Sequence, residues 1–217
     1  MTAHAMSAPE ALGRLREGNR RFAAGLLSTE VLATHTRRAD LVGGQRPFAI
    51  VLGCSDSRVP AEIVFDQGLG DLFVIRVAGN IVAPSQVGSV EFAAIRFGTP
   101  LVVVLGHSRC GAIEATLEAT LEELQQPAGA RSRNLRSIVN RIRPSVEALL
   151  ATELRHDPDA LAREAVKANV RASVDHLRHG SETLEELTAT SGLRIVGAEY
   201  SLETGLVEFH DEALDTD

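Results

Sequence analysis

The chain has 217 residues, of which 44% are hydrophobic and 24% charged, and this composition is typical of one globular domain with a substantial core. Its formal net charge is −7 and its Lys and Arg residues form no continuous run, which argues against nucleic-acid binding because affinity for phosphate needs clustered cations. No apolar stretch approaches the roughly 20 residues that span a bilayer, and residues 1–9 lack the pattern of a secretory signal. We therefore expect a cytoplasmic protein that folds as a single domain over residues 1–217 and binds neither nucleic acid nor membrane.

The first predicted element is an N-terminal amphipathic helix within residues 9–27. Its apolar stripe contains Leu12, Leu15, Phe22 and Leu26, and several arginines lie between them. Because this spacing places the apolar side chains on one side, the segment is typical of a helix that lies on a surface.

A strand buried on both faces is predicted at residues 48–52, which are apolar throughout. Gly53 follows and lets the backbone turn, so that Cys54 emerges at the carboxyl end of the strand. Asp56 and Arg58 come directly afterwards. Ligands bind at this edge in an open parallel sheet, so the first group of reactive side chains stands where such a fold predicts a site.

The next predicted elements again alternate between helix and strand. Pro60 predicts the start of a helical turn, and a second apolar run predicts a strand at residues 72–77. Ser85 is expected to cap a helix that ends at Gly98. The predicted core-facing residues of that helix are Val87, Val90, Ala94 and Ile95.

The arrangement of the first strand is repeated at residues 101–105, another fully apolar run. Gly106 turns the chain there, and His107 and Cys110 follow. If the two strands are neighbours, about 5 Å apart, these two side chains can converge with Cys54 on one point.

A helix is predicted to begin at Gly111, so that its positive dipole end lies beside the thiols and lowers their pKa. The remaining predicted elements are, in chain order, an amphipathic helix at 135–149, a helix at 158–177, a shorter helix at 184–187, a strand at 193–198 and an edge strand at 206–209. Pro144 is expected to interrupt the first of these helices, and residues 200–205 predict a hairpin before the edge strand.

Two thiolates and one neutral imidazole match the preferences of a tetrahedral zinc ion. Cys54, His107 and Cys110 are three such ligands, which leaves a fourth position for water, substrate or the Asp56 carboxylate. Asp56 and Arg58 are two residues apart, so in an extended segment both side chains project to the same side and can form a bidentate ion pair. A carboxylate with two possible partners, the metal and the guanidinium, predicts a switch.

The pattern Cys54-Ser-Asp56-Ser-Arg58, followed by His107-x-x-Cys110-Gly111, resembles the β-class carbonic anhydrases. The resemblance also includes Phe73, Arg76, residues 78–80, residues 88–91 and Gly106. It implies an α/β fold with a central, mostly parallel β-sheet, an antiparallel edge strand, flanking helices and an N-terminal helical arm. It further implies assembly as a homodimer or homotetramer and the reversible hydration of CO₂ to bicarbonate and a proton at zinc.

The resemblance gives each site residue an expected role. The zinc ligands are Cys54, His107 and Cys110, with Asp56 as a fourth ligand in a closed form only. In the open form Asp56, held by Arg58, accepts a hydrogen bond from zinc-bound hydroxide and aims it at CO₂.

Further residues are expected to bind the substrate. Val51, Phe73, Val77 and Phe92 would wall a small apolar pocket, although plain core packing explains the same four residues. Gln45 matches a family glutamine that reaches the substrate from across the dimer interface, and its alternative is an ordinary loop residue. The arm, residues 1–30, is expected to lie across the partner subunit.

A pH switch follows from the two partners of Asp56. As the pH falls, neutral water is a weaker ligand than hydroxide, so the carboxylate can displace it and close the site. Activity is therefore expected to rise through an apparent pKa above the value of roughly 7 that three neutral histidines give to zinc-bound water.

Other functions are compatible with parts of this pattern. Hydrolysis of carbonyl sulfide or carbon disulfide could use the same ligands, and a closed structural zinc site in a non-enzymatic protein could contain Asp56 as well, although Arg58 argues against it. A disulfide between Cys54 and Cys110 is a further alternative. A thiol phosphatase is excluded because Pro60 stands where its phosphate loop requires arginine.

Overall fold

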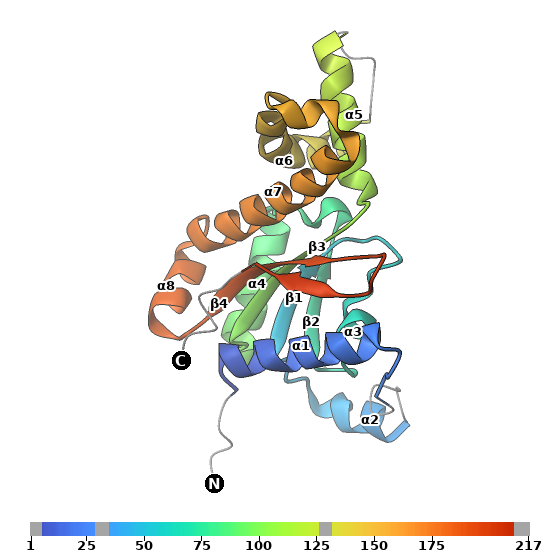
Figure 1. The fold of residues 1–217 in the computed structure, drawn as a ribbon. Coiled ribbons are helices and arrows are strands. Elements are labelled where there is room, and N and C mark those ends of the chain that lie inside the picture. Colours follow the sequence, from blue (N-terminus) through green and yellow to red (C-terminus); the bar gives the residue numbers. More distant parts are fainter. Residues whose placement is uncertain (1–5, 29–34, 126–131, 211–217) are drawn as a thin grey trace.

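The computed structural model describes residues 6–28, 35–125 and 132–210, which form a sheet with helices on both faces (Figure 1). The helices are α1 (Ala8–Ala23), α2 (His35–Asp40), η2 (Leu41–Gly43), α3 (Ala61–Val64), η3 (Ala78–Asn80), α4 (Pro84–Phe97), α5 (Gly111–Gln125), α6 (Arg133–Leu150), η4 (Glu153–His156), α7 (Pro158–His179) and α8 (Glu182–Thr190). The strands are β1 (Ala49–Gly53), β2 (Leu72–Arg76), β3 (Leu101–His107), β4 (Arg194–Tyr200) and β5 (Val207–Phe209). Within these ranges no helix has the length and apolar character needed to cross a membrane.

The strand order is β2-β1-β3-β4-β5. The first four strands run parallel, and β5 pairs antiparallel with β4 at the edge. The expected fold class, a mostly parallel sheet with an antiparallel edge strand, flanking helices and an N-terminal helix, is therefore confirmed.

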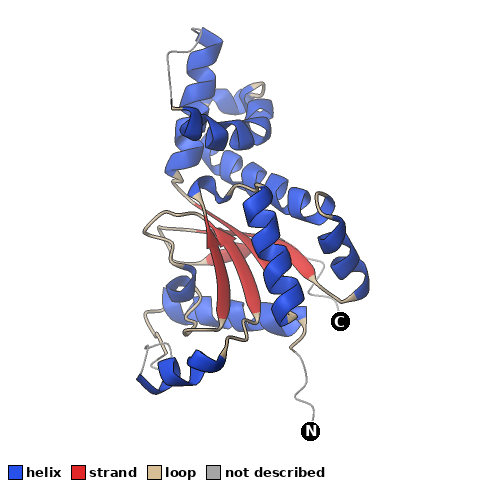
Figure 2. Ribbon diagram, turned by 180° about the vertical axis from the view of Figure 1, so that it is seen from behind, coloured by secondary structure: helices blue, strands red, loops and turns tan. Residues whose placement is uncertain are grey.

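Alternate residues of each central strand face opposite layers, as the two-residue period of a strand requires. On one face, Val51, Val103 and Val196 pack with α1 and α3. On the other face, Ile50 and Val104 pack with α4, α7 and α8. Figures 1 and 2 show α1 and α4 on these opposite faces. Both faces are covered, and this explains why the strand sequences are continuously apolar.

A third apolar cluster lies beyond the carboxyl ends of the strands. It joins α5, α6 and α7 and includes Cys54 and Cys110. Figure 1 shows α5 and α6 extending past the sheet at this end. The two cysteines therefore stand where the sheet meets a helical extension.

The predicted N-terminal helix is present as α1. Ser7 and Glu10 form a reciprocal capping box at its start, and Leu12 and Leu15 are buried. Leu26 was predicted to belong to the apolar stripe of this helix, but it lies beyond the end of α1 and is 68% exposed. Within the described chain α1 packs on its own sheet, and an arm that crosses to a partner subunit stays a prediction.

The predicted cap and core stripe of α4 are partly wrong. The helix begins at Pro84 with Ala83 as its N-cap and without a side-chain cap, because proline is already suited to the first helical position. Ser85 instead lies in the first turn, where its hydroxyl donates to Gln86. Ile95 was predicted to face the core and is 64% exposed. Gly98 ends the helix in the left-handed conformation, as predicted.

Pro144 does not interrupt α6, contrary to the prediction. The helix continues through it, and Ile142, Val146 and Leu150 on either side are buried against neighbouring helices. A proline inside a helix costs about 3 kcal/mol, so the burial of this apolar face outweighs the lost hydrogen bond.

Two glycines let α7 lie close to the sheet. A Cβ atom at Gly106 of β3 would lie 2.5 Å from Val170 Cγ2, and one at Gly197 of β4 would lie 2.8 Å from Val170 Cγ1. Because both distances are shorter than van der Waals contact, a larger residue at Gly106 would push α7 away from β3, which ends at His107, and one at Gly197 would push it away from β4.

We predict that Gly106→Ala lowers the free energy of unfolding by about 1–3 kcal/mol, the usual cost of overpacking a core. Urea unfolding at a fixed protein concentration measures this. The matched control is Gly13→Ala in α1, where nothing lies within 4 Å of the added methyl group, and there we expect no loss. Equal stability of Gly106→Ala and the unsubstituted chain would contradict the steric argument.

Candidate active site

Three side chains with metal-binding atoms meet at the carboxyl edge of the sheet. The donor atoms of Cys54, His107 and Cys110 lie within 4.8 Å of one another, and all three residues are buried. The two sulfurs are 4.0 Å apart, which is close to the roughly 3.8 Å between two sulfurs bound to a tetrahedral zinc ion. A disulfide would require about 2.05 Å, and both cysteines are free. The geometry is that of a metal site.

The pairing of β1 with β3 brings these residues together. β1 ends directly before Cys54, and its parallel neighbour β3 ends at His107. Cys110 immediately precedes α5, so the predicted start of this helix beside the thiols is correct. The structure therefore places the three residues together as the strand-end argument predicts.

His107 is oriented for metal binding. Its Nδ1 lies 2.9 Å from the carbonyl oxygen of Ser108, and because a carbonyl can only accept a hydrogen bond, Nδ1 carries the proton of the neutral ring. Nε2 then has the free lone pair, and among the described residues this buried atom has no hydrogen-bond partner. An unpaired buried nitrogen costs roughly 1–3 kcal/mol, which coordination of a metal ion would offset.

The Cys54 sulfur is surrounded by hydrogen-bond donors. The backbone N–H groups of Asp56 and Gly79 each lie 3.4 Å from Cys54 Sγ. The contact with Cys110 and these donors lower the pKa of the Cys54 thiol despite its burial. The same contact and burial raise the pKa of the Cys110 thiol, because a second negative charge beside the first is unfavourable. The backbone N–H groups of Ala112 and Ile113 at the start of α5 oppose this rise at Cys110 without outweighing it. The pKa therefore falls only at Cys54, where the start of α5 is not among the causes.

Asp56 and Arg58 form a bidentate ion pair. Arg58 donates from Nε to Asp56 Oδ1 over 2.9 Å and from Nη2 to Oδ2 over 2.7 Å. The Arg58 guanidinium holds the pKa of the Asp56 carboxyl well below its usual range. Asp56 Oδ2 also lies 4.0 Å from His107 Nε2, so the carboxylate stands beside the metal-binding atoms while it is paired with Arg58.

Arg76 holds the loop that follows β1. It donates from Nε to the carbonyl oxygen of Cys54 over 3.0 Å and from Nη2 to that of Asp56 over 2.6 Å. Arg76 belongs to the family resemblance, but no contact was predicted for its side chain. A charged residue at the end of an apolar strand was the signal that could have assigned it to the site edge.

Comparisons with known proteins agree with this geometry. The family model described as carbonic anhydrase matches residues 49–207. Carbonic anhydrase 2 of Mycobacterium tuberculosis is 41% identical over 197 residues, which cover 91% of this chain and 90% of that protein. A carbonic anhydrase of Mycolicibacterium smegmatis is 42% identical over 198 residues and 89% of each chain. A tetrameric β-carbonic anhydrase from Sordaria macrospora superimposes with a TM-score of 0.68 at 27% identity, covering 79% of this chain and 84% of that one.

The chain belongs to the β-carbonic anhydrase family. It is a carbonic anhydrase, and the matched residues 49–207 include all three candidate metal ligands together with Asp56 and Arg58.

The other residues expected to bind substrate in this carbonic anhydrase differ in how deeply their side chains are buried. Val51 is fully buried inside the layer between the sheet and α1, so it has no surface for a substrate. Phe73 and Val77 are half-buried at the edge of the opposite layer. Phe92 is 53% exposed on α4, with its ring centroid 6.2 Å from that of Phe73. Gln45 is exposed in the segment before β1.

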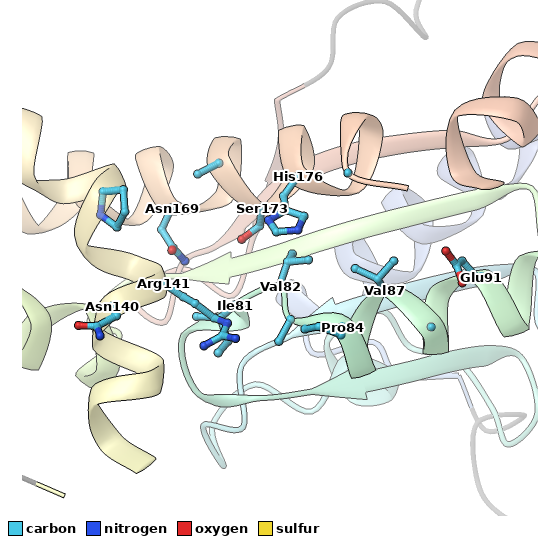
Figure 3. Close-up of a pocket in the computed structure, with 15 residues that line it drawn as sticks. Ile81, Val82, Pro84, Val87, Glu91, Asn140, Arg141, Asn169, Ser173 and His176 are labelled. Atoms are coloured by element: carbon cyan, nitrogen blue, oxygen red, sulfur yellow. The ribbon is translucent and has the colours of Figure 1, made fainter. Parts of the chain in front are cut away.

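A cavity of about 720 Å³ lies beside the enzyme's sheet, between α4, α6 and α7. Figure 3 shows Ile81, Val82 and Val87 on one side of it and Asn169 with Ser173 of α7 on the other. Its lining includes none of the three candidate ligands and neither Asp56 nor Arg58. The cavity is therefore separate from the site at the strand ends.

We predict that Cys54→Ser, Cys110→Ser and His107→Ala each reduce bound zinc from about one ion per chain to a small fraction of that, because two protein ligands do not hold zinc tightly. Elemental analysis after dialysis of zinc-loaded protein measures the stoichiometry. The control is Ser57→Ala, an exposed residue of the same loop, which should keep its zinc. Full zinc occupancy in any of the three ligand variants would remove that residue from the ligand set.

Proposed function

We propose that this carbonic anhydrase catalyses the reversible hydration of CO₂ to bicarbonate and a proton, with a zinc ion held by Cys54, His107 and Cys110. One observation carries the proposal. The buried His107 ring offers a metal-binding nitrogen within 4.8 Å of two thiol sulfurs. Its Nε2 has no hydrogen-bond partner among the described residues and lies beside a carboxylate fixed by arginine. The names of the relatives, all carbonic anhydrases, support this reading.

The three side chains fit zinc in donor type, spacing and protonation. Two sulfurs and one imidazole nitrogen are a borderline-soft donor set that leaves a fourth position open. When bound, the ion would lower the pKa of a water molecule and so supply a nucleophile near neutral pH. Ser108 supports the histidine by fixing the ring through Nδ1.

In this proposal Asp56 orients the nucleophile. Its carboxylate is ionised and held at both oxygens by Arg58, so it can accept a hydrogen bond from a neighbouring O–H group without taking the proton. Accepting that bond directs a lone pair of the oxygen toward CO₂. The positioning of the lone pair, rather than proton abstraction, is then the contribution of this residue.

The Asp56 and Arg58 pair also supports gating of the site. Paired with Arg58, the carboxylate leaves the fourth ligand position free. Turned away from Arg58, it would fill that position as a fourth protein ligand, and the 4.0 Å distance from Oδ2 to His107 Nε2 makes this a short movement. The pH dependence expected from the sequence stays a prediction that activity measured across pH would test.

CO₂ binding is proposed on apolar side chains of β2, of the residue that follows it and of α4. Phe73, Val77 and Phe92 offer the surface that a small uncharged molecule requires, whereas Val51 is too deeply buried to take part. Gln45 is proposed to reach this surface in the partner subunit, since it is exposed on its own chain.

The enzyme is proposed to assemble as a homodimer or homotetramer. Phe92 and Ile95 are more than half exposed on one helix, α4, and large apolar side chains gathered on a surface mark interaction sites. The neighbour from Sordaria macrospora is described as tetrameric, which supports an oligomer here. A cytoplasmic location is part of the same proposal.

We predict that Asp56→Asn and Arg58→Gln each reduce kcat/KM for CO₂ hydration by about 100-fold or more, because each removes one half of the orienting pair. Stopped-flow CO₂ hydration with zinc quantitation on the same samples measures this, and carbonyl sulfide and carbon disulfide are tested in parallel. Ser57→Ala serves again as the control. A zinc-loaded unsubstituted enzyme that hydrolyses carbon disulfide but does not hydrate CO₂ would refute the proposed substrate.

We predict that Phe92→Asp shifts the enzyme toward smaller species, because a charge on the apolar surface of α4 must be desolvated when subunits meet. Sedimentation velocity measures the distribution. Ile63→Asp on α3, an exposed apolar residue outside α4, is the control. Unchanged sedimentation of Phe92→Asp would place the subunit interface elsewhere.

A further inference from the structure

The two metal ligands His107 and Cys110 are separated by only two residues, Ser108 and Arg109. Arg109 has a φ of +54°, in the left-handed region that bulky L-residues rarely adopt, at a cost of roughly 1–2 kcal/mol. Such a conformation persists only where the surroundings fix it. The spacing of the two ligands therefore depends on what holds these two residues.

Glu203 contacts both of them. Its Oε2 accepts a hydrogen bond from Ser108 Oγ over 2.8 Å, and its Oε1 accepts one from Arg109 Nε over 2.7 Å. Each carboxylate oxygen thus fixes one of the two residues between the ligands. The Ser108 hydroxyl oxygen in turn accepts from the backbone N–H of Leu202 over 2.9 Å, which ties the same segment to the hairpin that carries Glu203.

The hairpin is itself anchored on its far side. The Asn19 side chain, buried in α1, donates to the carbonyl oxygen of Gly205 over 2.9 Å and accepts from the backbone N–H of Val207 over 2.8 Å. On the near side, the Ser108 N–H donates to the carbonyl oxygen of Tyr200 over 2.9 Å. Glu203 is therefore presented from a turn that is fixed at both ends.

The fixed segment also reaches the Asp56 pair. Arg58 Nη2, which donates to Asp56 Oδ2, donates in addition to the carbonyl oxygen of Arg109 over 3.1 Å. The direction of that carbonyl depends on the left-handed conformation of Arg109. A substitution of Arg109 would therefore alter both the spacing of the two ligands and the orientation of Arg58.

We propose that Glu203 is a positioning residue of this enzyme. It holds Ser108 and the strained Arg109 so that His107 and Cys110 face one metal ion and Arg58 faces Asp56. Glu203 touches neither metal nor substrate, and it acts only through these two residues. The inference rests on the metal site of the proposed function and adds a contact that sets its geometry.

The test compares Glu203→Gln with Glu208→Gln, which removes the same charge from an exposed glutamate of β5. Zinc affinity is measured by chelator competition, and the geometry of the site by the visible absorption of the cobalt-substituted protein. We expect about 10- to 100-fold weaker zinc binding and an altered cobalt spectrum for Glu203→Gln, the range that is typical when a residue that orients metal ligands is lost. We expect no change in either readout for Glu208→Gln.

Three measurements distinguish positioning from a general structural role. Side chains as exposed as those of Arg109 and Glu203, at 72% and 50%, contribute little to global stability, so the Tm of the metal-free protein should be unchanged in Glu203→Gln. Glu203→Asp should restore part of the zinc affinity. In Arg109→Gly, where glycine accepts the left-handed conformation without strain, adding Glu203→Gln should cost several-fold less affinity than it does beside Arg109.

Several results would overturn the inference. An unchanged zinc affinity and cobalt spectrum in Glu203→Gln would do so, as would an equal effect of Glu208→Gln or an equal effect of Glu203→Gln with and without Arg109. These outcomes leave the proposed function intact as long as the unsubstituted enzyme binds zinc. Absence of zinc binding by the unsubstituted enzyme would overturn the inference and the proposed function together.

Discussion

The parallel pairing of β1 with β3 is the constraint on which the site depends. These two strands end at Gly53 and His107, and their shared direction delivers Cys54 and His107 to one edge. Neither strand is polar before its last residues and both are buried throughout, so burial of both faces holds them side by side inside the sheet. The same burial that stabilises the sheet therefore fixes the distance between the metal-binding atoms.

Placing two thiols and an imidazole in an apolar layer is unfavourable unless their charges are compensated. In the described chain the compensation is distributed over several elements. Backbone N–H groups of Asp56 and Gly79 face one sulfur, a carbonyl fixes the histidine ring, and an arginine neutralises the adjacent carboxylate. A dication would complete this balance, since it is the one partner that suits two thiolates and an imidazole lone pair at once.

The parts of the site that the sequence could predict are those set by short-range rules. Strand ends, the three-residue spacing of His107 and Cys110 and the two-residue spacing of Asp56 and Arg58 all follow from backbone geometry. Contacts between distant segments could not be predicted in this way. Glu203 reaches Arg109 across 94 residues, and nothing in the local sequence indicates that contact.

Predictions from local sequence were wrong at positions where tertiary packing decides the structure. Pro144 is a helix breaker by propensity, but it lies within a helix in which Ile142 and Val146, two residues away on either side, are fully buried. Ile95 satisfies the helical stripe of α4 and yet faces outward, because the apolar surface of that helix is wider than one sheet can cover. A subunit interface is the physical reason that we propose for this excess.

We propose that three side chains at two strand ends hold one zinc ion. X-ray absorption at the zinc edge of the loaded enzyme measures which atoms surround that ion. We expect two sulfur neighbours at about 2.3 Å and two lighter neighbours at about 2.0–2.1 Å. A zinc ion with only nitrogen and oxygen neighbours, or with a single sulfur, would contradict it.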